Sequence, residues 1–336
     1  MRDLRPWLRD LPKAELHVHL EGTVSPQAYE RIAQRNGVTL PSDIASLFRC
    51  ADFESFLHAF LGVAKTLREP EDFADITQEY LGKSAQHGVR HVEFFFSPAT
   101  IRHFHEHADL PGIVQAIYAA AEQAKAIHGV SSLLIFDMVR NLGDDAALAD
   151  VDLAQQCTAY GVVGVGLGGD ERNFPARDFF KSFDRAGKLG LRRTAHAGEA
   201  AGPQSVLDAI EILGAERIGH GVAAAEEDAV MRLIAQRQVG IDCCLASNRV
   251  TGVWNQGAEH PLKAFLARGI SATLSSDDPA FFGSTILDEF EQAMDLGLGR
   301  EDVINLARNS LRMSFAADEQ KEGWVKELEL FVAERT

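Results

Sequence analysis

The sequence predicts an α/β fold, a (β/α)8 TIM barrel with a helical insertion between its first and second strands. Eight short apolar segments recur along the chain, and stretches with helical periodicity separate them. Several segments are too continuously apolar to alternate, as expected for parallel strands covered by helices. Polar side chains lie at the ends of several segments, where a closed barrel builds its active site. An open doubly wound sheet is the alternative.

The predicted strands follow these apolar segments in order. They are Ala14–Leu20, Val89–Ser97, Ser131–Val139, Val162–Gly168, Leu191–His196, Arg217–His220, Val239–Cys243 and Ile270–Ser276. Pro261 stands where the first turn of a helix tolerates proline, and Gly269 stands where that helix should end. Ser205 is expected to cap a helix over Val206–Leu213, and Gly214 to end it.

The segment between the first two strands is too long for an ordinary connection. It has about seventy residues, and its pattern predicts helices over Ser25–Asn36, Phe53–Leu67 and Glu71–Gln86. We interpret residues 24–88 as a helical insertion over one rim of the barrel, either a lid or extra packing. The helical spacing of Phe53, Phe56 and Phe60 favours core packing over an apolar wall beside a substrate.

Composition and charge limit the possible partners. The chain has 336 residues, of which 46% are hydrophobic and 24% charged. Single α/β barrels often reach this length, so we expect one domain over residues 1–336. Asp and Glu number 49 against 33 Lys and Arg, which gives a formal net charge of −16. Such a surface repels phosphate backbones and anionic lipid, so we expect no nucleic-acid partner and no membrane. The oligomeric state is not predicted.

Three features predict a cytoplasmic location. No apolar run approaches the roughly 18 residues of a membrane span. The N-terminal segment carries charges where a signal peptide would be apolar. The four cysteines form no C-x-x-C pair, and Cys243 and Cys244 on the seventh predicted strand are expected to be buried structural thiols.

A pair of histidines ends the first predicted strand. His17 and His19 are two residues apart, so in a strand both imidazoles face the same side and could bind one metal ion. An isolated H-x-H pair is equally compatible with a structural role.

Further polar residues end other predicted strands and strengthen this interpretation. His196 ends the fifth strand, His220 ends the sixth, and Asp277 and Asp278 follow the eighth. In a barrel these ends converge on one face. Imidazole and carboxylate are ligands of zinc-like ions, which supply hydroxide near neutral pH. Glu199 lies close enough to His196 in sequence to exchange a proton with a substrate. The set predicts a metal-assisted hydrolase.

Two other patterns are weaker. Gly164–Gly169 matches G-x-G-x-x-G, but a dinucleotide fingerprint should lead directly into a helix, and Asp170–Pro175 has the composition of a loop. His103, His105 and His107 alternate in what we expect to be a polar, solvated loop away from any strand end.

The chain resembles the adenosine deaminase family of the metal-dependent amidohydrolase superfamily. The matching motifs occur in the family's order over nearly the whole length. They are Leu11–Gly22 (LPKAELHVHLEG), Gly166–Glu171 (GLGGDE), His196–Pro203 (HAGEAAGP), Glu216–Gly221 (ERIGHG), Ser247–Gly252 (SNRVTG) and Ser275–Pro279 (SSDDP). The resemblance implies a barrel with one divalent metal, usually zinc. A second metal is not expected, because the fourth predicted strand lacks the lysine that bridges metals in other superfamily members.

The resemblance also implies roles for individual residues. The implied metal ligands are His17, His19, His196 and Asp277. The implied catalytic residues are Glu199, which protonates purine N1, His220, which holds and helps deprotonate the attacking water, and Asp277.

Substrate contacts are implied at four positions, one of which is also an implied metal ligand. The backbone N–H of Gly169 approaches N3, Asp278 faces N7, and Glu21 and His19 complete the set. Because a neutral N7 accepts hydrogen bonds, Asp278 must carry a proton to bond it. We therefore expect burial beside Asp277 to raise the pKa of Asp278.

The identity of the substrate is less firmly indicated. Glu21 stands where adenosine-specific members usually have aspartate, as in relatives that act on adenine or aminodeoxyfutalosine, and Gly166–Glu171 mixes features of both groups. Other motifs resemble bacterial adenosine deaminases. We rank adenosine and 2′-deoxyadenosine first, converted to inosine and 2′-deoxyinosine with release of ammonia. Aminodeoxyfutalosine ranks second and adenine third. A non-catalytic metal-binding relative and a hydrolase of non-purine amides are the other hypotheses.

Overall fold

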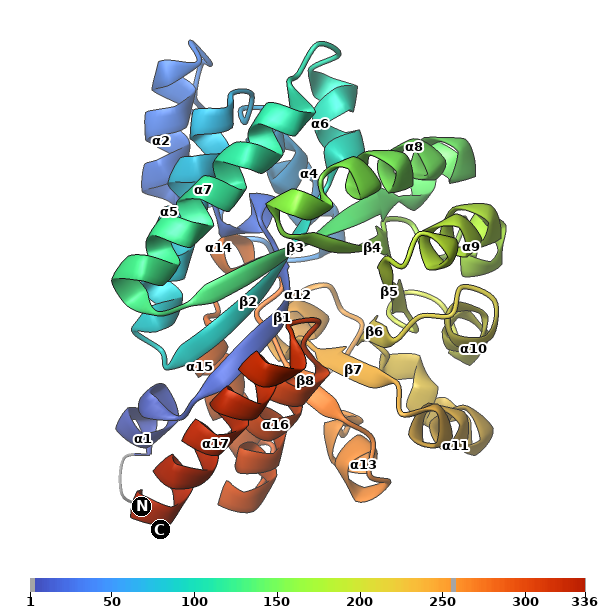
Figure 1. The fold of residues 1–336 in the computed structure, drawn as a ribbon. Coiled ribbons are helices and arrows are strands. Elements are labelled where there is room, and N and C mark those ends of the chain that lie inside the picture. Colours follow the sequence, from blue (N-terminus) through green and yellow to red (C-terminus); the bar gives the residue numbers. More distant parts are fainter. Residues whose placement is uncertain (1–3, 255–257, 336) are drawn as a thin grey trace.

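The fold is a barrel of eight parallel strands surrounded by helices (Figure 1). It is taken from a computed structural model that describes residues 4–254 and 258–335. Residues 1–3, 255–257 and 336 of the predicted domain lie outside the described part. The strands are β1 (Lys13–His19), β2 (Val89–Phe96), β3 (Ser131–Val139), β4 (Val162–Gly168), β5 (Arg192–Ala197), β6 (Arg217–His220), β7 (Gly240–Cys243) and β8 (Ala272–Leu274). All eight predicted strands occur, each within two residues of its expected ends.

The barrel closes between its first and last strands. Neighbouring strands pair in sequence order from β1 to β8, and a parallel bridge joins Val18 to Asp277, beyond the end of β8. The His19 N–H donates to the Asp277 carbonyl at 3.0 Å, and the Asp277 N–H donates to the His17 carbonyl at 3.1 Å. The predicted (β/α)8 barrel is confirmed, and the open-sheet alternative is wrong.

Helices and short 3-10 turns connect the strands. Outside the insertion, the helices are α1 (Arg5–Asp10), α6 (Pro98–Phe104), α7 (Leu110–His128), α8 (Gly143–Gln156), α9 (Phe180–Lys188), α10 (Pro203–Glu211), α11 (Asp228–Arg237), α12 (Leu245–Val250), α13 (Leu262–Ala267), α14 (Pro279–Phe282), α15 (Ile286–Asp295), α16 (Arg300–Met313) and α17 (Asp318–Arg335). The 3-10 turns are η1 (Glu21–Thr23), η2 (Arg140–Leu142), η3 (Thr158–Tyr160), η4 (Ala176–Phe179) and η5 (Val222–Glu226). No described helix has the length and apolar composition needed to cross a bilayer.

One predicted helix start is wrong. Helix α10 begins at Pro203 with Gly202 at its N-cap, and the Ser205 hydroxyl has no hydrogen-bond partner among the described residues. Proline is favoured at the first helical position, because its φ is already helical and its missing N–H is not needed there. This preference places the start of the helix ahead of the serine.

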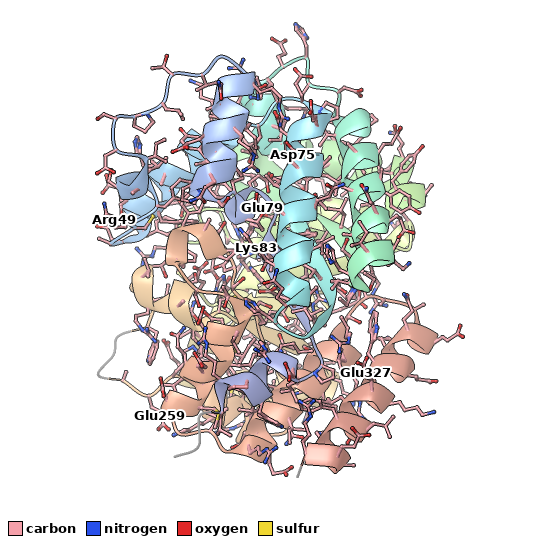
Figure 2. The ribbon with its side chains drawn as sticks, turned by 90° about the vertical axis from the view of Figure 1, so that its left-hand side faces the viewer. Arg49, Asp75, Glu79, Lys83, Glu259 and Glu327 are labelled. Carbon is pink, nitrogen blue, oxygen red and sulfur yellow. The ribbon has the colours of Figure 1, made fainter. Side chains whose placement is uncertain are left out.

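The insertion between β1 and β2 is helical, as predicted. It consists of α2 (Pro26–Arg35), α3 (Ile44–Leu47), α4 (Phe53–Ala64) and α5 (Pro70–Ala85), of which the short α3 was not predicted. Asp75, Glu79 and Lys83 follow one another along α5 (Figure 2). Glu79 accepts hydrogen bonds from Arg31 at 3.0 Å and from the Ser25 hydroxyl at 2.7 Å. These bonds tie α2 to α5.

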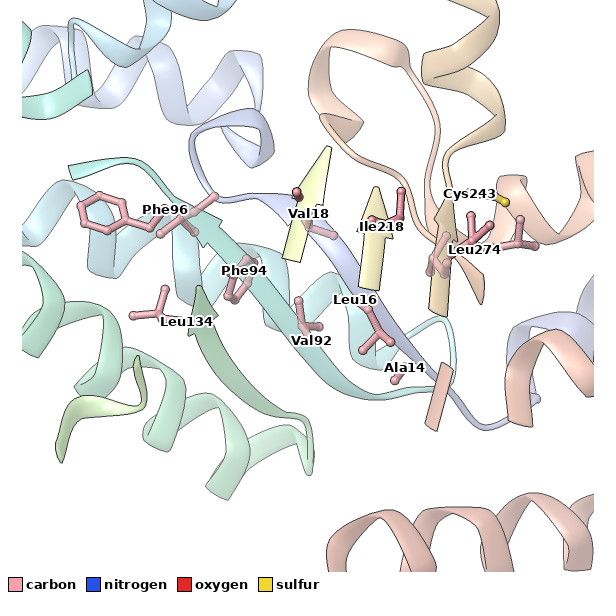
Figure 3. Close-up of a cluster of buried hydrophobic side chains, with 14 of the residues drawn as sticks. Ala14, Leu16, Val18, Val92, Phe94, Phe96, Leu134, Ile218, Cys243 and Leu274 are labelled. Atoms are coloured by element: carbon pink, nitrogen blue, oxygen red, sulfur yellow. The ribbon is translucent and has the colours of Figure 1, made fainter. Parts of the chain in front are cut away.

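The two faces of strand β1 differ in polarity. Ala14, Leu16 and Val18 belong to the apolar core and lie in the cluster shown in Figure 3. The alternate positions of the strand include Glu15 and His17, which are also buried. Because side chains alternate along a strand, the apolar positions face one side of β1 and the polar ones the other. The barrel therefore has a polar interior.

A buried ion cluster occupies part of this interior. Arg217 forms an ion pair with Glu93 at 2.6 Å and donates to Asp242 at 3.1 Å, and all three side chains are fully buried. The guanidinium also donates to the backbone carbonyls of Leu16 at 3.3 Å and Met313 at 3.0 Å. One side chain thus links strands β1, β2, β6 and β7.

Removing this cation should destabilise the barrel strongly. We expect Arg217→Met to lower the free energy of unfolding by about 3–5 kcal/mol, because two buried carboxylates lose their counter-ion. Urea unfolding followed by circular dichroism measures the change. The control is Arg185→Met, which breaks an exposed ion pair with Asp152 and should cost less than about 1 kcal/mol. Equal losses in both variants would contradict this account.

Candidate active site

A cavity opens at the carboxyl ends of the strands. Its volume is about 420 Å3, within the range of small-molecule sites. Eight of the predicted site residues line it: His19, Glu21, Gly169, His196, Glu199, His220, Asp277 and Asp278. The ninth, His17, is fully buried and lies in ring contact with three of the other histidines.

Four of these residues form a compact group of possible metal ligands. One nitrogen or oxygen from each of His17, His19, His196 and Asp277 lies within 4.8 Å of the others. His19 Nε2 is 3.2 Å from His196 Nε2, and Asp277 Oδ1 is 3.4 Å from His19 Nε2 and 3.5 Å from His17 Nε2. Both ring nitrogens of His17 are buried without a hydrogen-bond partner among the described residues. Three imidazoles and a carboxylate suit a zinc-like ion.

The local backbone explains how these side chains meet. His220 and Asp277 adopt φ values of 64°, in the left-handed region that non-glycine residues rarely occupy. Such strain is concentrated at functional sites, where the surrounding structure holds it. Gly219 leaves space for the His17 side chain, because a Cβ at position 219 would lie 2.6 Å from the His17 ring. A Cβ on Gly22 would overlap the Asp278 carboxyl.

The two adjacent aspartates, Asp277 and Asp278, have pKa values shifted in opposite directions. For Asp278, burial is the main cause of a pKa well above the usual range, and the charges of Asp277 and Glu21 add to it. Burial would also raise the pKa of Asp277, but the nearby imidazoles of His17, His220 and His19 outweigh it and hold the pKa well below the usual range. The direction for Asp278 agrees with the expectation from the sequence. One carboxyl can thus donate a hydrogen bond while its neighbour stays ionised.

Two of the candidate ligands are held in the neutral form. Burial lowers the pKa of His19 to about 3, and it lowers the pKa of His196 well below the usual range. A neutral imidazole is the form that binds a metal.

Glu199 and His220 stand next to the ligand group. Glu199 Oε2 lies 3.7 Å from His220 Nε2, which in turn lies 3.9 Å from Asp277 Oδ2. Burial raises the pKa of Glu199. The Asn248 amide lies 3.0 Å from His220 Nδ1 and orients the ring. Asn248 occurs in the SNRVTG motif, but its role could not be deduced from the sequence.

Glu171 holds the loop that carries Glu199. Its two carboxylate oxygens accept the backbone N–H groups of Gly198, Glu199, Ala200 and Ala201 at 2.6–3.1 Å. Sequence reasoning included Glu171 only in a motif and did not foresee this function.

The sequence analysis also missed a buried carboxyl. Asp137 on β3 lines the cavity, and its Oδ2 lies 3.8 Å from His19 Nδ1. Burial raises the pKa of Asp137 well above the usual range. The residue belongs to no quoted motif and lies within a strand rather than after one, so no sequence signal drew attention to it.

Four residues that were expected to lie in the core or in a solvated loop line the cavity. Phe53, Phe56 and Phe60 of α4 all line the cavity, although Phe56 and Phe60 also pack against the core. His103 is helical, because α6 extends to Phe104, and it lines the cavity as well. The chain that follows β4 forms a loop, as expected, and not the helix that a dinucleotide site requires.

Comparison with known proteins now assigns the family. The family model described as "Adenosine deaminase" matches residues 12–330. The chain belongs to the adenosine deaminase family. An adenine deaminase of Cupriavidus metallidurans is 39% identical over 329 residues, covering 96% of this chain and 92% of that protein. The predicted family is therefore confirmed.

Two solved structures have the same fold. The crystal structure of an adenine deaminase from Arthrobacter aurescens matches with a TM-score of 0.90 and 35% identity, over 96% of this chain and 99% of that one. An amidohydrolase from Burkholderia ambifaria, solved with bound zinc, matches with a TM-score of 0.91 and 25% identity, over 98% and 94%. The protein is a metal-dependent hydrolase of the deaminase type, acting on C–N bonds. The non-catalytic alternative loses its support.

Metal content tests the ligand group. We expect His17→Ala to lower the divalent metal bound per chain at least about tenfold after dialysis, because it removes one of four candidate ligands. Elemental analysis of the purified protein measures this, with circular dichroism to check the fold. The control is His58→Ala, which removes an exposed histidine of α4. Full metal occupancy in His17→Ala would exclude His17 as a ligand.

Proposed function

We propose that this protein is a zinc-dependent adenine deaminase, which hydrolyses adenine to hypoxanthine and ammonia. The observation that carries the proposal is that relatives 37–39% identical over most of this chain are named adenine deaminase. Adenosine ranked first from the sequence alone, and these relatives support the third-ranked substrate instead. The single domain, the cytoplasmic location and the absence of nucleic-acid partners stay predictions from the sequence.

The metal ligands in this proposal are the four clustered residues. They are His17, His19, His196 and Asp277. When bound, a single zinc ion would act as a Lewis acid and lower the pKa of a water molecule. The remaining chemistry is assigned to side chains of this protein.

Proton transfer is assigned to Glu199 and His220. Water adds to C6 while Glu199 gives its proton to N1, which makes C6 more electrophilic. Burial raises the pKa of Glu199, which favours the protonated form that this role requires. His220 takes the proton of the attacking water. His220 then passes this proton to the amino nitrogen, the C6–N bond breaks, and ammonia leaves. The C6 hydroxyl becomes a carbonyl by returning its proton to Glu199.

Two contacts orient the ring. The Asp278 carboxyl, whose pKa burial raises, donates a hydrogen bond to N7. The N–H of Gly169 donates to N3, and its φ of 94° suits glycine. A Cβ at Gly169 would lie 2.7 Å from Asn141 Oδ1, so the close approach of this backbone also requires glycine.

The burial and hydrogen bonding of Glu21 support a free base, rather than a nucleoside, as the substrate. Its Oε1 accepts the Ser97 N–H at 3.0 Å, its exposed fraction is 1%, and burial raises its pKa to about 7. The longer side chain is therefore held against the start of α6 and is already hydrogen-bonded. A shorter aspartate, as in adenosine-specific relatives, would leave room for a sugar hydroxyl.

Removing the proposed acid should abolish most turnover. We expect Glu199→Gln to lower kcat by about 10²–10⁴-fold while zinc content stays unchanged, since Glu199 is outside the ligand group. Ammonia release and elemental analysis measure the two effects. Glu211→Gln is the matched control, an exposed glutamate at the end of α10. Substantial activity in Glu199→Gln would remove Glu199 from this role.

The proposed substrate is tested by comparing kcat/KM for four candidate substrates. We expect kcat/KM for adenine to exceed the values for adenosine, 2′-deoxyadenosine and aminodeoxyfutalosine by at least about 100-fold, because discrimination reflects binding in the transition state. Ammonia release by zinc-loaded protein measures all four. A higher value for adenosine or aminodeoxyfutalosine would contradict the proposal.

A further inference from the structure

Asp137 is a buried carboxyl that the proposed mechanism leaves unused. Its exposed fraction is 6%, and its Oδ1 forms no hydrogen bond within the described part of the chain. The nearby guanidinium of Arg140 donates instead to the carbonyls of Phe174 and His196, at 2.8 and 2.7 Å. A buried polar group without a partner is costly, so its presence in a cavity calls for an explanation.

Space for this carboxyl is built into the neighbouring strand. β4 pairs with β3 and places Gly166 opposite Asp137. A Cβ on Gly166 would lie 3.1 Å from Asp137 Oδ1, and one on Gly168 would lie 2.7 Å from Oδ2. Two glycines thus accommodate the carboxyl at the edge of the cavity, which Gly168 also lines.

The order of the strands places Asp137 relative to the proposed substrate contacts. Asp278 follows β8, Glu199 follows β5 and Gly169 follows β4. Between Asp278 and Glu199 lie β6, which ends at His220, and β7. Between Asp278 and Gly169, on the other side, the arc from β1 to β3 presents Glu21 and Asp137 to the cavity.

The perimeter of a purine has its own fixed order. Passing around the ring from N7 through C6, one meets N1, then N3, then N9, before returning to N7. With N7 at Asp278, N1 at Glu199 and N3 at Gly169, as in the proposed function on which this step rests, N9 faces the arc from β1 to β3. Free adenine carries a hydrogen on N9 when N7 accepts a bond, whereas a nucleoside carries its sugar there.

We propose that Asp137 accepts a hydrogen bond from N9–H of adenine and so selects the free base over purines substituted at N9. A carboxyl keeps an acceptor oxygen whether or not it is protonated. A substituent at N9 removes the donor and leaves the buried carboxyl unpaired. Sites built to bond an N–H reject analogues that lack it far more strongly than apolar pockets reject an extra methyl group.

A positioning role is the competing explanation. Asp137 Oδ2 lies 3.8 Å from His19 Nδ1, and carboxylates beside a metal-binding histidine often fix its ring. Removing such a residue would lower zinc content and slow every substrate alike. Removing an N9–H acceptor would act on adenine and spare purines that have no N9–H.

The test compares adenine with 9-methyladenine in wild type and Asp137→Ala, both loaded with zinc. We expect wild type to favour adenine by at least about 100-fold in kcat/KM. In Asp137→Ala the value for adenine should fall about 100-fold, the preference should shrink to less than about tenfold, and zinc content should not change. Asp137→Asn keeps a carbonyl acceptor and should restore part of the preference. Asp145→Ala, an exposed aspartate of α8, is the matched control.

The outcomes separate the two proposals. Equal losses for adenine and 9-methyladenine, accompanied by zinc loss, would overturn the inference and assign Asp137 to positioning. An unchanged preference in Asp137→Ala would also overturn it. A wild type that fails to deaminate adenine would instead contradict the proposed function, and this inference with it. If the variants turn over too slowly, dissociation constants of hypoxanthine and 9-methylhypoxanthine provide the same comparison.

Discussion

The site depends on how the barrel closes. Strands β1 and β8 meet through backbone bonds between His17, His19 and Asp277, the same residues whose side chains form most of the candidate metal group. The backbone bonds that close the barrel therefore also position these three candidate metal ligands. The left-handed backbone at Asp277 is held by these bonds, which over-determine a conformation that would otherwise be unfavourable.

Burial then gives the carboxyl groups different properties. Asp277 lies among imidazoles and keeps its charge, whereas burial raises the pKa of Asp278, Glu199, Glu21 and Asp137. A cavity that holds so many carboxyls is unsuitable for an anionic ligand. It suits a neutral molecule whose edge alternates between donors and acceptors, which is the pattern of an aminopurine base.

Most of the architecture and much of the site could be predicted from the sequence. The strands were found because a covered parallel sheet leaves continuous apolar segments, and His17, His19 and Asp277 because strand ends of a barrel converge. The start of α10 was missed because Pro203 outweighed the capping preference of Ser205. The cavity-lining role of Phe53 was missed because helical spacing does not distinguish a core from a cavity wall. Asp137, Asn248 and Glu171 act through neighbours from other strands or loops, and such contacts leave no local signal.

The central claim is the orientation of the base in the mouth of the barrel, and a crystal structure of the zinc-loaded protein with hypoxanthine tests it most directly. We predict zinc bound by His17, His19, His196 and Asp277, with N1 beside Glu199, N7 beside Asp278 and N9 within hydrogen-bond distance of Asp137. A base rotated so that N9 points toward Gly169 or out of the cavity, with Asp137 unpaired, would contradict the account.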